Sequence, residues 1–153
     1  MSTPEPGVVH IAADDGAFPW ASFPGGKLRL LRADVQTGEW VIHNQFEPGF
    51  TAEKHRHTGH VDAITIRGRW RYLEYGVDYG PGSYVYEPTN SLHQLHVPDD
   101  LDGVCEVVFV MRGANLNLGA DGSVTSITDG AGTLAAYHML CEMQGLGTPA
   151  ISS

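Results

Sequence analysis

Short stretches in which apolar and polar residues alternate are the strongest pattern in the chain. These runs are "LRLLRADV" (28–35), "EWVIHNQFEPG" (39–49), "VDAITIRG" (61–68), "RWRYLEYG" (69–76), "GSYVYEP" (82–88), "HQLHVP" (93–98) and "GVCEVVFVMRG" (103–113). Their β-branched and aromatic residues, separated by Gly, Pro, Asn and Asp, are typical of antiparallel strands joined by turns. The pattern predicts an all-β sandwich or barrel of about nine to eleven strands.

Helical periodicity occurs only near the end of the sequence. The spacing i, i+3, i+4, i+7 is followed by Leu134, Tyr137, His138 and Cys141. It predicts one helix over 131–144, which Thr128 or Asp129 caps and Gly145 ends. Because His138 lies on or beside the apolar stripe, we expect it to pack rather than to bind a ligand.

The length of 153 residues is that of one domain. We expect a single domain over 1–153, with a core at about 28–146 and loosely ordered tails. A chain of this size can bury a core without a metal, so a metal ion would serve function rather than folding.

Composition and charge narrow the partners. The formal charge of -9 disfavours nucleic acid and anionic membrane surfaces. No apolar run is long enough for a membrane span, and the first residues do not resemble a signal peptide, so the cytoplasm is expected. Cys105 and Cys141 lie far apart in apolar surroundings and are expected to be buried thiols.

Three histidines fall within six residues in the stretch "EKHRHTGH". Residues i and i+2 of a strand point to the same face, so His55 and His57 can bring two imidazoles together while Arg56 points away. This pair predicts part of a metal site. His60 has an odd offset from His57, which favours a role beside the ligands or at the surface.

The flanking residues resemble the paired motifs of the cupin superfamily. The motif glycines and proline are Gly49, Gly68, Gly82 and Pro88. The resemblance implies an RmlC-like jelly roll in which His55, His57 and His93 bind the metal. The first motif usually also has a glutamate, and here its position falls on Val61 or, one residue later, on Asp62. Alternation directs Val61 inward, which favours a site of three histidines.

A closer likeness covers about 28–146. The phrases "GRWRYLEY", "YVYEP" and "YHMLCEMQGLG" are similar to the 2,4'-dihydroxyacetophenone dioxygenase group of cupins and, more loosely, to acetylacetone-cleaving dioxygenases and ChrR-like cupin domains. The resemblance implies Fe(II) and the use of O2 to cleave a carbon–carbon bond next to a carbonyl. Its substrate would be a small hydroxyketone or β-diketone, and a homodimer or homotetramer is expected.

Two alternatives stay open at this point. Imidazole also suits zinc, nickel, manganese or copper, so the first alternative is a non-redox isomerase, cyclase or hydrolase. The other alternative is a metal-binding or ligand-binding module without turnover.

Candidate pocket residues follow from alternation in "RWRYLEY". Trp70, Tyr72 and Glu74 share one face, which is expected to point inward as an aromatic wall with one carboxylate. Glu87, just before Pro88, is a second candidate. Either glutamate would accept a substrate proton or hold the second N–H of a liganding histidine.

Overall fold

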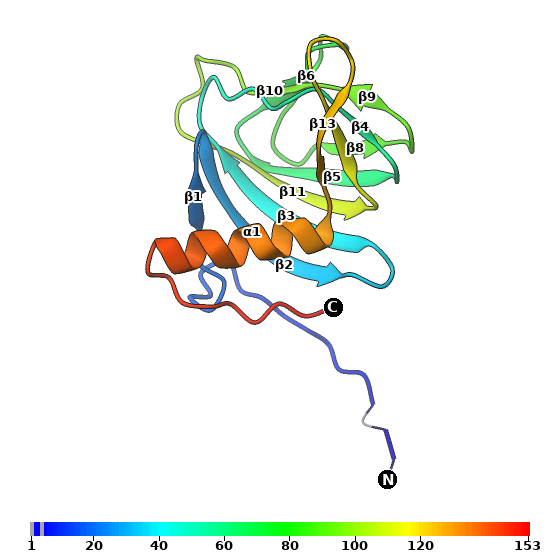
Figure 1. The fold of residues 1–153 in the computed structure, drawn as a ribbon. Helices are drawn as coiled ribbons and strands as arrows, with labels where there is room; N and C mark the ends of the chain where they lie inside the picture. The colour runs from blue at the N-terminus through cyan, green and yellow to red at the C-terminus, as the bar shows by residue number, and fades with distance from the viewer. Residues whose placement is uncertain (1, 4) are drawn as a thin grey trace.

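The computed structural model describes residues 2–3 and 5–153, in which thirteen strands and one C-terminal helix form a β-sandwich (Figure 1). This confirms the all-β prediction with its single helix, but the number of strands was underestimated. Six of the strands have only two or three residues, and the single run predicted at 93–98 divides between two of them. Within the described part of the chain, no helix is long and apolar enough to cross a membrane.

The larger layer is a six-stranded sheet in which every neighbouring pair is antiparallel. In spatial order its strands are β1 (Ala21–Phe23), β2 (Gly26–Asp34), β3 (Glu39–Phe46), β11 (Cys105–Arg112), β5 (Val61–Arg67) and β8 (Tyr84–Glu87). The central strand β11 pairs along most of its length with both β3 and β5, which ties the sheet together.

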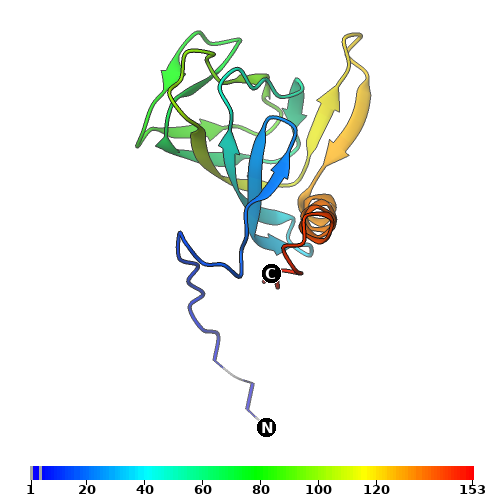
Figure 2. The same ribbon diagram turned by 90° about the vertical axis from the view of Figure 1, so that its left-hand side faces the viewer.

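Two smaller sheets face this layer. The four-stranded sheet has the order β13 (Val124–Thr128), β12 (Asn115–Leu118), β4 (His55–His57) and β9 (Leu92–His93). The three-stranded sheet has the order β10 (Leu95–His96), β6 (Trp70–Tyr72) and β7 (Asp78–Tyr79). Figure 2 shows the β12–β13 hairpin, yellow to orange, standing to one side and leading into the helix.

Strict alternation in β11 shows how the sequence builds the core. Cys105, Val107, Phe109 and Met111 are buried, whereas the residues between them are partly exposed. Burying a side chain of this size contributes about 1.5–3 kcal/mol. The inward residues of β11 therefore fasten the large sheet to the layer that carries the short strands.

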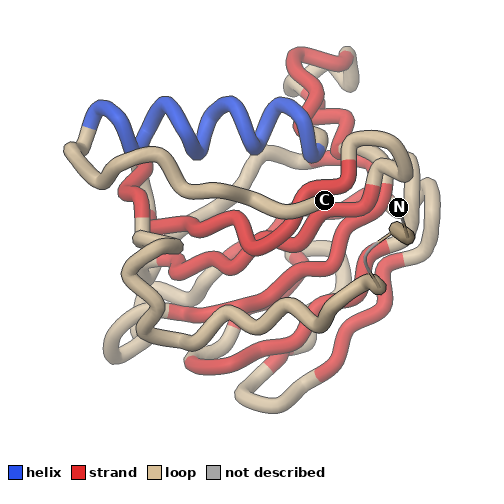
Figure 3. Tube along the Cα trace, turned by 90° about the horizontal axis from the view of Figure 1, so that it is seen from below, coloured by secondary structure: helices blue, strands red, loops and turns tan. Residues whose placement is uncertain are grey.

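The helix α1 (Gly130–Met143) begins and ends within one residue of its prediction. Asp129 is the N-cap, and its side chain accepts a hydrogen bond from the Gly132 N–H at 2.8 Å. Gly145, with φ of 69°, takes the left-handed conformation just past the helix end. The helix packs on β2 and β1, and Figure 3 shows it along one side of the strands.

The C-terminal tail differs from the expectation of loose order. Ser152 accepts a hydrogen bond from the Ala33 N–H on β2 at 3.0 Å, and His138 bonds the Pro149 carbonyl at 2.8 Å. Partly buried Ile151 packs against the core. The C-terminal tail therefore packs on the folded domain, which its glycine-rich sequence does not predict. At the other end, the predicted loose tail includes Met1 and Pro4, which lie outside the described residues.

Candidate metal centre

His55, His57 and His93 converge from two paired strands. His55 and His57 lie on one face of β4, and His93 on β9 is directly opposite His55 in the ladder. Their ring centroids are 4.7–4.9 Å apart, and one nitrogen from each ring lies within 4.8 Å of the others. All three side chains are buried. Arg56 points away, as alternation predicted, and donates to the Asn90 carbonyl.

The ring orientations leave nitrogens free toward a common point. The Nδ1 of His55 lies 2.9 Å from the Glu53 carbonyl oxygen, to which it donates, so its Nε2 stays an acceptor. The Nε2 atoms of His57 and His93 are 2.9 Å apart. That separation suits two nitrogens that share one ion, because metal–nitrogen bonds are about 2.0–2.1 Å long.

Burial keeps these imidazoles neutral. Desolvation, with repulsion from neighbouring histidines, lowers the pKa of His57 to about 4 and that of His93 to about 3. Desolvation likewise lowers the pKa of His55 below its usual range. Neutral imidazole is the form that binds a metal, so the donor set fits a divalent transition-metal ion.

Glu87 on β8 brings a carboxylate to the same place. Its Oε1 lies 3.4 Å from His93 Nε2, and its Oε2 lies 3.7 Å from His57 Nε2. Burial raises its pKa to about 8, and neither oxygen has a hydrogen-bond partner among the described residues. Glu87 is paired with Val61 across the β5–β8 ladder, so this carboxylate lies on the strand beside the one with the usual glutamate position of the motif.

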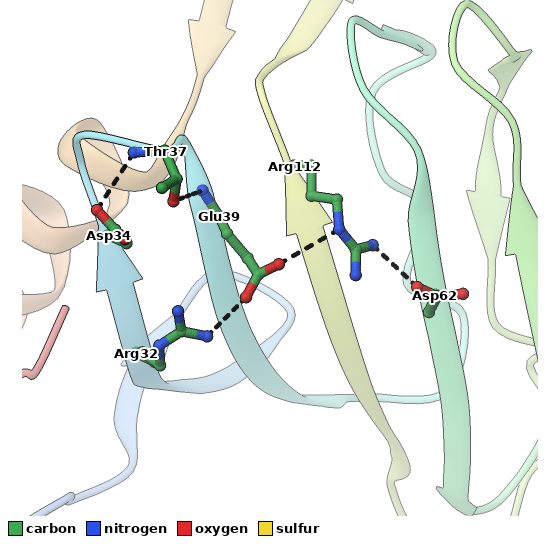
Figure 4. Close-up of polar contacts among 6 residues, drawn as sticks. All are labelled: Arg32, Asp34, Thr37, Glu39, Asp62 and Arg112. Atoms are coloured by element: carbon green, nitrogen blue, oxygen red, sulfur yellow. Dashed lines mark hydrogen bonds and ion pairs between the residues drawn. The ribbon is translucent and has the colours of Figure 1, made fainter. Parts of the chain in front are cut away.

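The choice between Val61 and Asp62 is settled by the direction of their side chains. Val61 is fully buried in the core. Asp62 faces the outer side of the sheet, where Arg112 donates a hydrogen bond to it (Figure 4). Tyr84 donates a second one. Neither Val61 nor Asp62 supplies a carboxylate to the histidines.

The aromatic wall predicted on β6 is only partly found. Tyr72 lines the cavity beside the histidines and stacks on His93, with centroids 3.8 Å apart. Trp70 is fully buried, but it donates from Nε1 to the Thr65 hydroxyl at 2.8 Å and does not line the cavity. Its inward direction was right, but it packs in the core.

The inward placement of Glu74 was wrong. Strand β6 ends at Tyr72, so alternation no longer applies two residues later. Glu74 is exposed and accepts a hydrogen bond from the Gln94 N–H at 2.8 Å, although its charge still acts on His55.

His60 and His96 stay outside the cluster. The His60 ring lies 5.9 Å from that of Tyr86, whose side chain is exposed. His96 bonds the Thr51 hydroxyl through Nδ1 at 2.7 Å. The structure therefore gives neither of them a place beside the three histidines.

A cavity of about 540 Å³ lies against His55 and His57. Its apolar wall comes from the large sheet and the loops beside it, and includes Leu28, Trp40, Ile42, Phe46, Phe50, Phe109 and Met111. Its polar wall comes from the four-stranded sheet, where Asn115 and Asn117 on β12 stand opposite His57 and His55. This size and mixture are typical of a small-molecule site.

Several cavity residues were missed from the sequence. They include Asn44, Asn115 and Thr133. The alternation in "NLNL" places Asn115 and Asn117 on one face, which is a signal that could have been used. Nothing local distinguishes Asn44 or Thr133 from surface polar residues.

The comparisons with known proteins match most of the chain. A family model described as ChrR cupin-like domain matches residues 8–114. A crystal structure from Ralstonia eutropha JMP134, of a protein of unknown function with a cupin-like fold, is 31% identical with a TM-score of 0.87. That match covers 100% of this chain and 96% of the other. A search of curated proteins finds no match.

Two structures of lower sequence identity resemble this chain in fold only. An RmlC-like cupin protein from the same organism is 21% identical, with a TM-score of 0.85, and the match covers 95% of this chain and 96% of that one. An acetylacetone dioxygenase from Acinetobacter johnsonii is 15% identical, with a TM-score of 0.73, and the match covers 90% of this chain and 95% of that one.

Proposed function

The chain belongs to the family of ChrR cupin-like domains, and we propose that it acts as a metal-dependent dioxygenase that cleaves a carbon–carbon bond next to a carbonyl. Membership confirms the cupin fold expected from the histidine and glycine motifs. The observation that carries the proposal is the set of three buried, neutral histidines, two of which, His55 and His57, line a largely apolar cavity.

The proposed cofactor is Fe(II), held by His55, His57 and His93. Bound there, Fe(II) supplies a Lewis-acid centre and the redox chemistry that O2 requires. Three uncharged ligands leave the ion its full charge, which favours a substrate that binds through an anionic oxygen. This supports a hydroxyketone or β-diketone over a neutral alkane or an amine.

The protein's own part in the reaction is to hold a proton and exclude water. Glu87, buried beside His57 and His93, can accept the proton that a hydroxyketone loses when its oxygen becomes anionic. Tyr72 stacks on His93 and fixes its ring. The aromatic and aliphatic wall keeps water from the reacting atoms.

A protein of the same fold is named for chemistry of this kind. The Acinetobacter johnsonii structure is an acetylacetone dioxygenase, and acetylacetone is a β-diketone. We therefore expect a small neutral carbonyl compound and O2 as substrates.

Oxygen uptake is the direct test. The protein is loaded with Fe(II) without air and then mixed with O2 and a panel of hydroxyacetophenones and β-diketones. Consumption of O2 with at least one of them is expected. No uptake with any, together with stoichiometric zinc in the protein as purified, would point to the non-redox alternative.

The ligand set has a matched control within the chain. His93→Ala is expected to lose metal, measured by elemental analysis after gel filtration. His96→Ala removes a histidine three residues away that bonds Thr51 instead, and it should keep full metal. Full metal in the His93→Ala variant would show that the third ligand lies elsewhere.

A further inference from the structure

We propose that Asn115 positions the metal ligand His57. Its amide oxygen Oδ1 accepts a hydrogen bond from the His57 Nδ1–H, which holds the other ring nitrogen, Nε2, toward the metal. This inference rests on the metal site of the proposed function, and it concerns how the chain holds a ligand rather than which substrate it takes.

The register of the strands brings the two side chains together. Asn115 on β12 is directly opposite His57 on β4 in the antiparallel ladder. Residues that are opposite each other in such a ladder have Cβ atoms about 4.5–5.5 Å apart, and their side chains point to the same face. Both residues line the cavity, so this shared face is the inner one. An amide and an imidazole placed in this way are within reach of each other.

Each of the two side chains has a buried atom that the rest of the chain leaves unpaired. His57 Nδ1 and Asn115 Oδ1 are both buried, and as the side chains stand neither meets the geometry of a hydrogen bond with any described residue. Asn115 nevertheless acts on the ring. Desolvation is the main cause of the low pKa of His57, and the Asn115 side chain opposes it as a hydrogen-bond partner. A bond between the two atoms satisfies both at once.

The proton of the His57 ring belongs on Nδ1. The Nε2 atoms of His57 and His93 lie 2.9 Å apart, at the point where the rings converge. A neutral imidazole carries one proton, so this proton is on Nδ1 when Nε2 is the metal ligand. An amide oxygen only accepts hydrogen bonds. Asn115 Oδ1 therefore selects the tautomer that leaves Nε2 free to bind.

His55 has the same arrangement with a different acceptor. Its Nδ1 donates to the Glu53 carbonyl oxygen at 2.9 Å. Asn117 stands opposite His55 in the ladder, but its amide donates to the hydroxyls of Ser126 and Thr128 at 3.0 and 2.9 Å. Two asparagines on one face of β12 thus differ in role. Asn117 holds the hairpin together, and Asn115 faces a ligand that has no main-chain acceptor.

A partner on Nδ1 has two effects on a liganding histidine. It fixes the orientation of the ring, and it makes Nε2 a more basic donor. Loss of such a partner lowers metal affinity by about 10–100-fold. Asn115 is therefore expected to act on metal affinity through His57, without itself binding the ion.

Zinc affinity measures this effect without oxygen chemistry. Competition with a chelating dye gives the Kd of Zn(II) for the native protein and each variant. Asn115→Leu keeps a side chain of similar size but removes the acceptor, and it should weaken binding by about 10–100-fold. Asn115→Asp supplies a stronger acceptor at the same place and should bind Zn(II) at least as tightly as the native protein. Asn117→Leu is the matched control and should keep the native Zn(II) affinity.

The ring proton itself separates positioning from a general loss of folding. NMR spectra are recorded on the protein labelled with ¹⁵N at histidine, with Zn(II) well above Kd so that the site stays filled in every variant. The Nδ1–H groups of His55 and His57 should both give slowly exchanging signals. Asn115→Leu should shift or abolish the His57 signal and leave the His55 signal in place, because that proton is bonded to Glu53.

Three results would overturn the proposal. They are a native Zn(II) affinity in Asn115→Leu, an unchanged His57 Nδ1–H signal in that variant, and a loss of affinity in Asn115→Asp as large as in Asn115→Leu. The dioxygenase proposal fails independently, since it is judged by oxygen uptake of the Fe(II) protein. Oxygen uptake together with native Zn(II) affinity in Asn115→Leu would reject the role of Asn115 alone.

Discussion

The two faces of the six-stranded sheet treat polar groups in opposite ways. On the outer face, Arg32, Glu39, Arg112 and Asp62 form a ladder of ion pairs across four strands (Figure 4). Its three links measure 2.6, 3.3 and 2.9 Å. On the inner face, Glu87 has no hydrogen-bond partner among the described residues. These four charged residues of the outer face are paired with one another, whereas the described residues offer the inner Glu87 no hydrogen bond.

The energies of the two faces differ accordingly. Partly exposed ion pairs contribute about 0–1 kcal/mol each, because water and salt screen them. A buried polar group without a partner costs about 1–3 kcal/mol. A protein retains such a cost where the group serves binding or chemistry, so the unpaired inner groups are the better guide to function.

The largest effect is expected at the inner face, when the metal-binding histidines are removed. An ion that binds only the folded protein raises the unfolding temperature in proportion to the logarithm of its concentration over Kd. Differential scanning calorimetry with and without Fe(II) or Zn(II) should show a rise for the native protein and none for His57→Ala. A rise of equal size in His57→Ala would place the metal elsewhere.

The pH dependence of the metal-free protein tests the unpaired carboxylate. The pKa of Glu87 is about 8 in the folded protein, above the unfolded value of 4.5, so the folded state holds the proton more tightly. The stability from this group is therefore lost as pH rises toward 8. Between about pH 6.5 and 8 the loss should be roughly 2 kcal/mol.

The buried histidines, whose pKa in the folded protein lies below its usual range, are half protonated at pH 6.5 in the unfolded chain only, so they add stability as the pH rises to about 7.5 and oppose the effect of Glu87. Urea unfolding in the presence of a chelator therefore compares the native protein with Glu87→Gln, and the stability of the native protein relative to the variant should fall by roughly 2 kcal/mol between about pH 6.5 and 8. A Glu87→Gln variant with the same slope as the native protein would contradict the assignment.

Removal of the Thr133 hydroxyl should raise the unfolding free energy, by less than the losses predicted above. Thr133→Val keeps the shape of the side chain and removes a buried hydroxyl that has no hydrogen-bond partner among the described residues. The ligand-free variant should therefore gain up to about 1 kcal/mol in unfolding free energy. Urea unfolding gives the value. A loss of stability would mean that the hydroxyl has a partner within the chain.

The outer ladder should show the smallest effect. Arg112→Met breaks two of the three links but keeps an extended side chain, and it should lower the unfolding free energy by less than about 1 kcal/mol. The difference should shrink at high salt, and the metal content should not change. Loss of metal in this variant would show that the two faces are coupled.

The sequence predicted side-chain directions correctly where the two-residue alternation of a strand alone decides them. Alternation places His55 and His57 together and turns Val61 inward, and the structure shows both directions. It was wrong for Glu74 because the strand ends two residues earlier. It also could not show that Trp70 would reach Thr65 instead of the cavity, since that depends on packing between strands.

The polar residues of the cavity could not be predicted from the sequence, for a different reason. Asn44 and Thr133 belong to a strand and a helix that are far apart in sequence, and only the packing of α1 on the sheet creates the space that they line. Glu87 was named from its proximity to His93 along the chain. Its place across the ladder from Val61, where the cupin motif usually has a glutamate, follows from strand pairing, which the sequence does not encode locally.

The contact between Gly130 and Trp40 has a consequence for the evolution of this molecule. A methyl group at position 130 would come within 3.2 Å of the side chain of Trp40, a residue that lines the cavity. A side chain there would displace the indole and so alter the cavity, although position 130 itself does not line it. Evolution can therefore change the size of the accepted substrate by substitution at position 130 alone. Every residue that lines the cavity would stay the same.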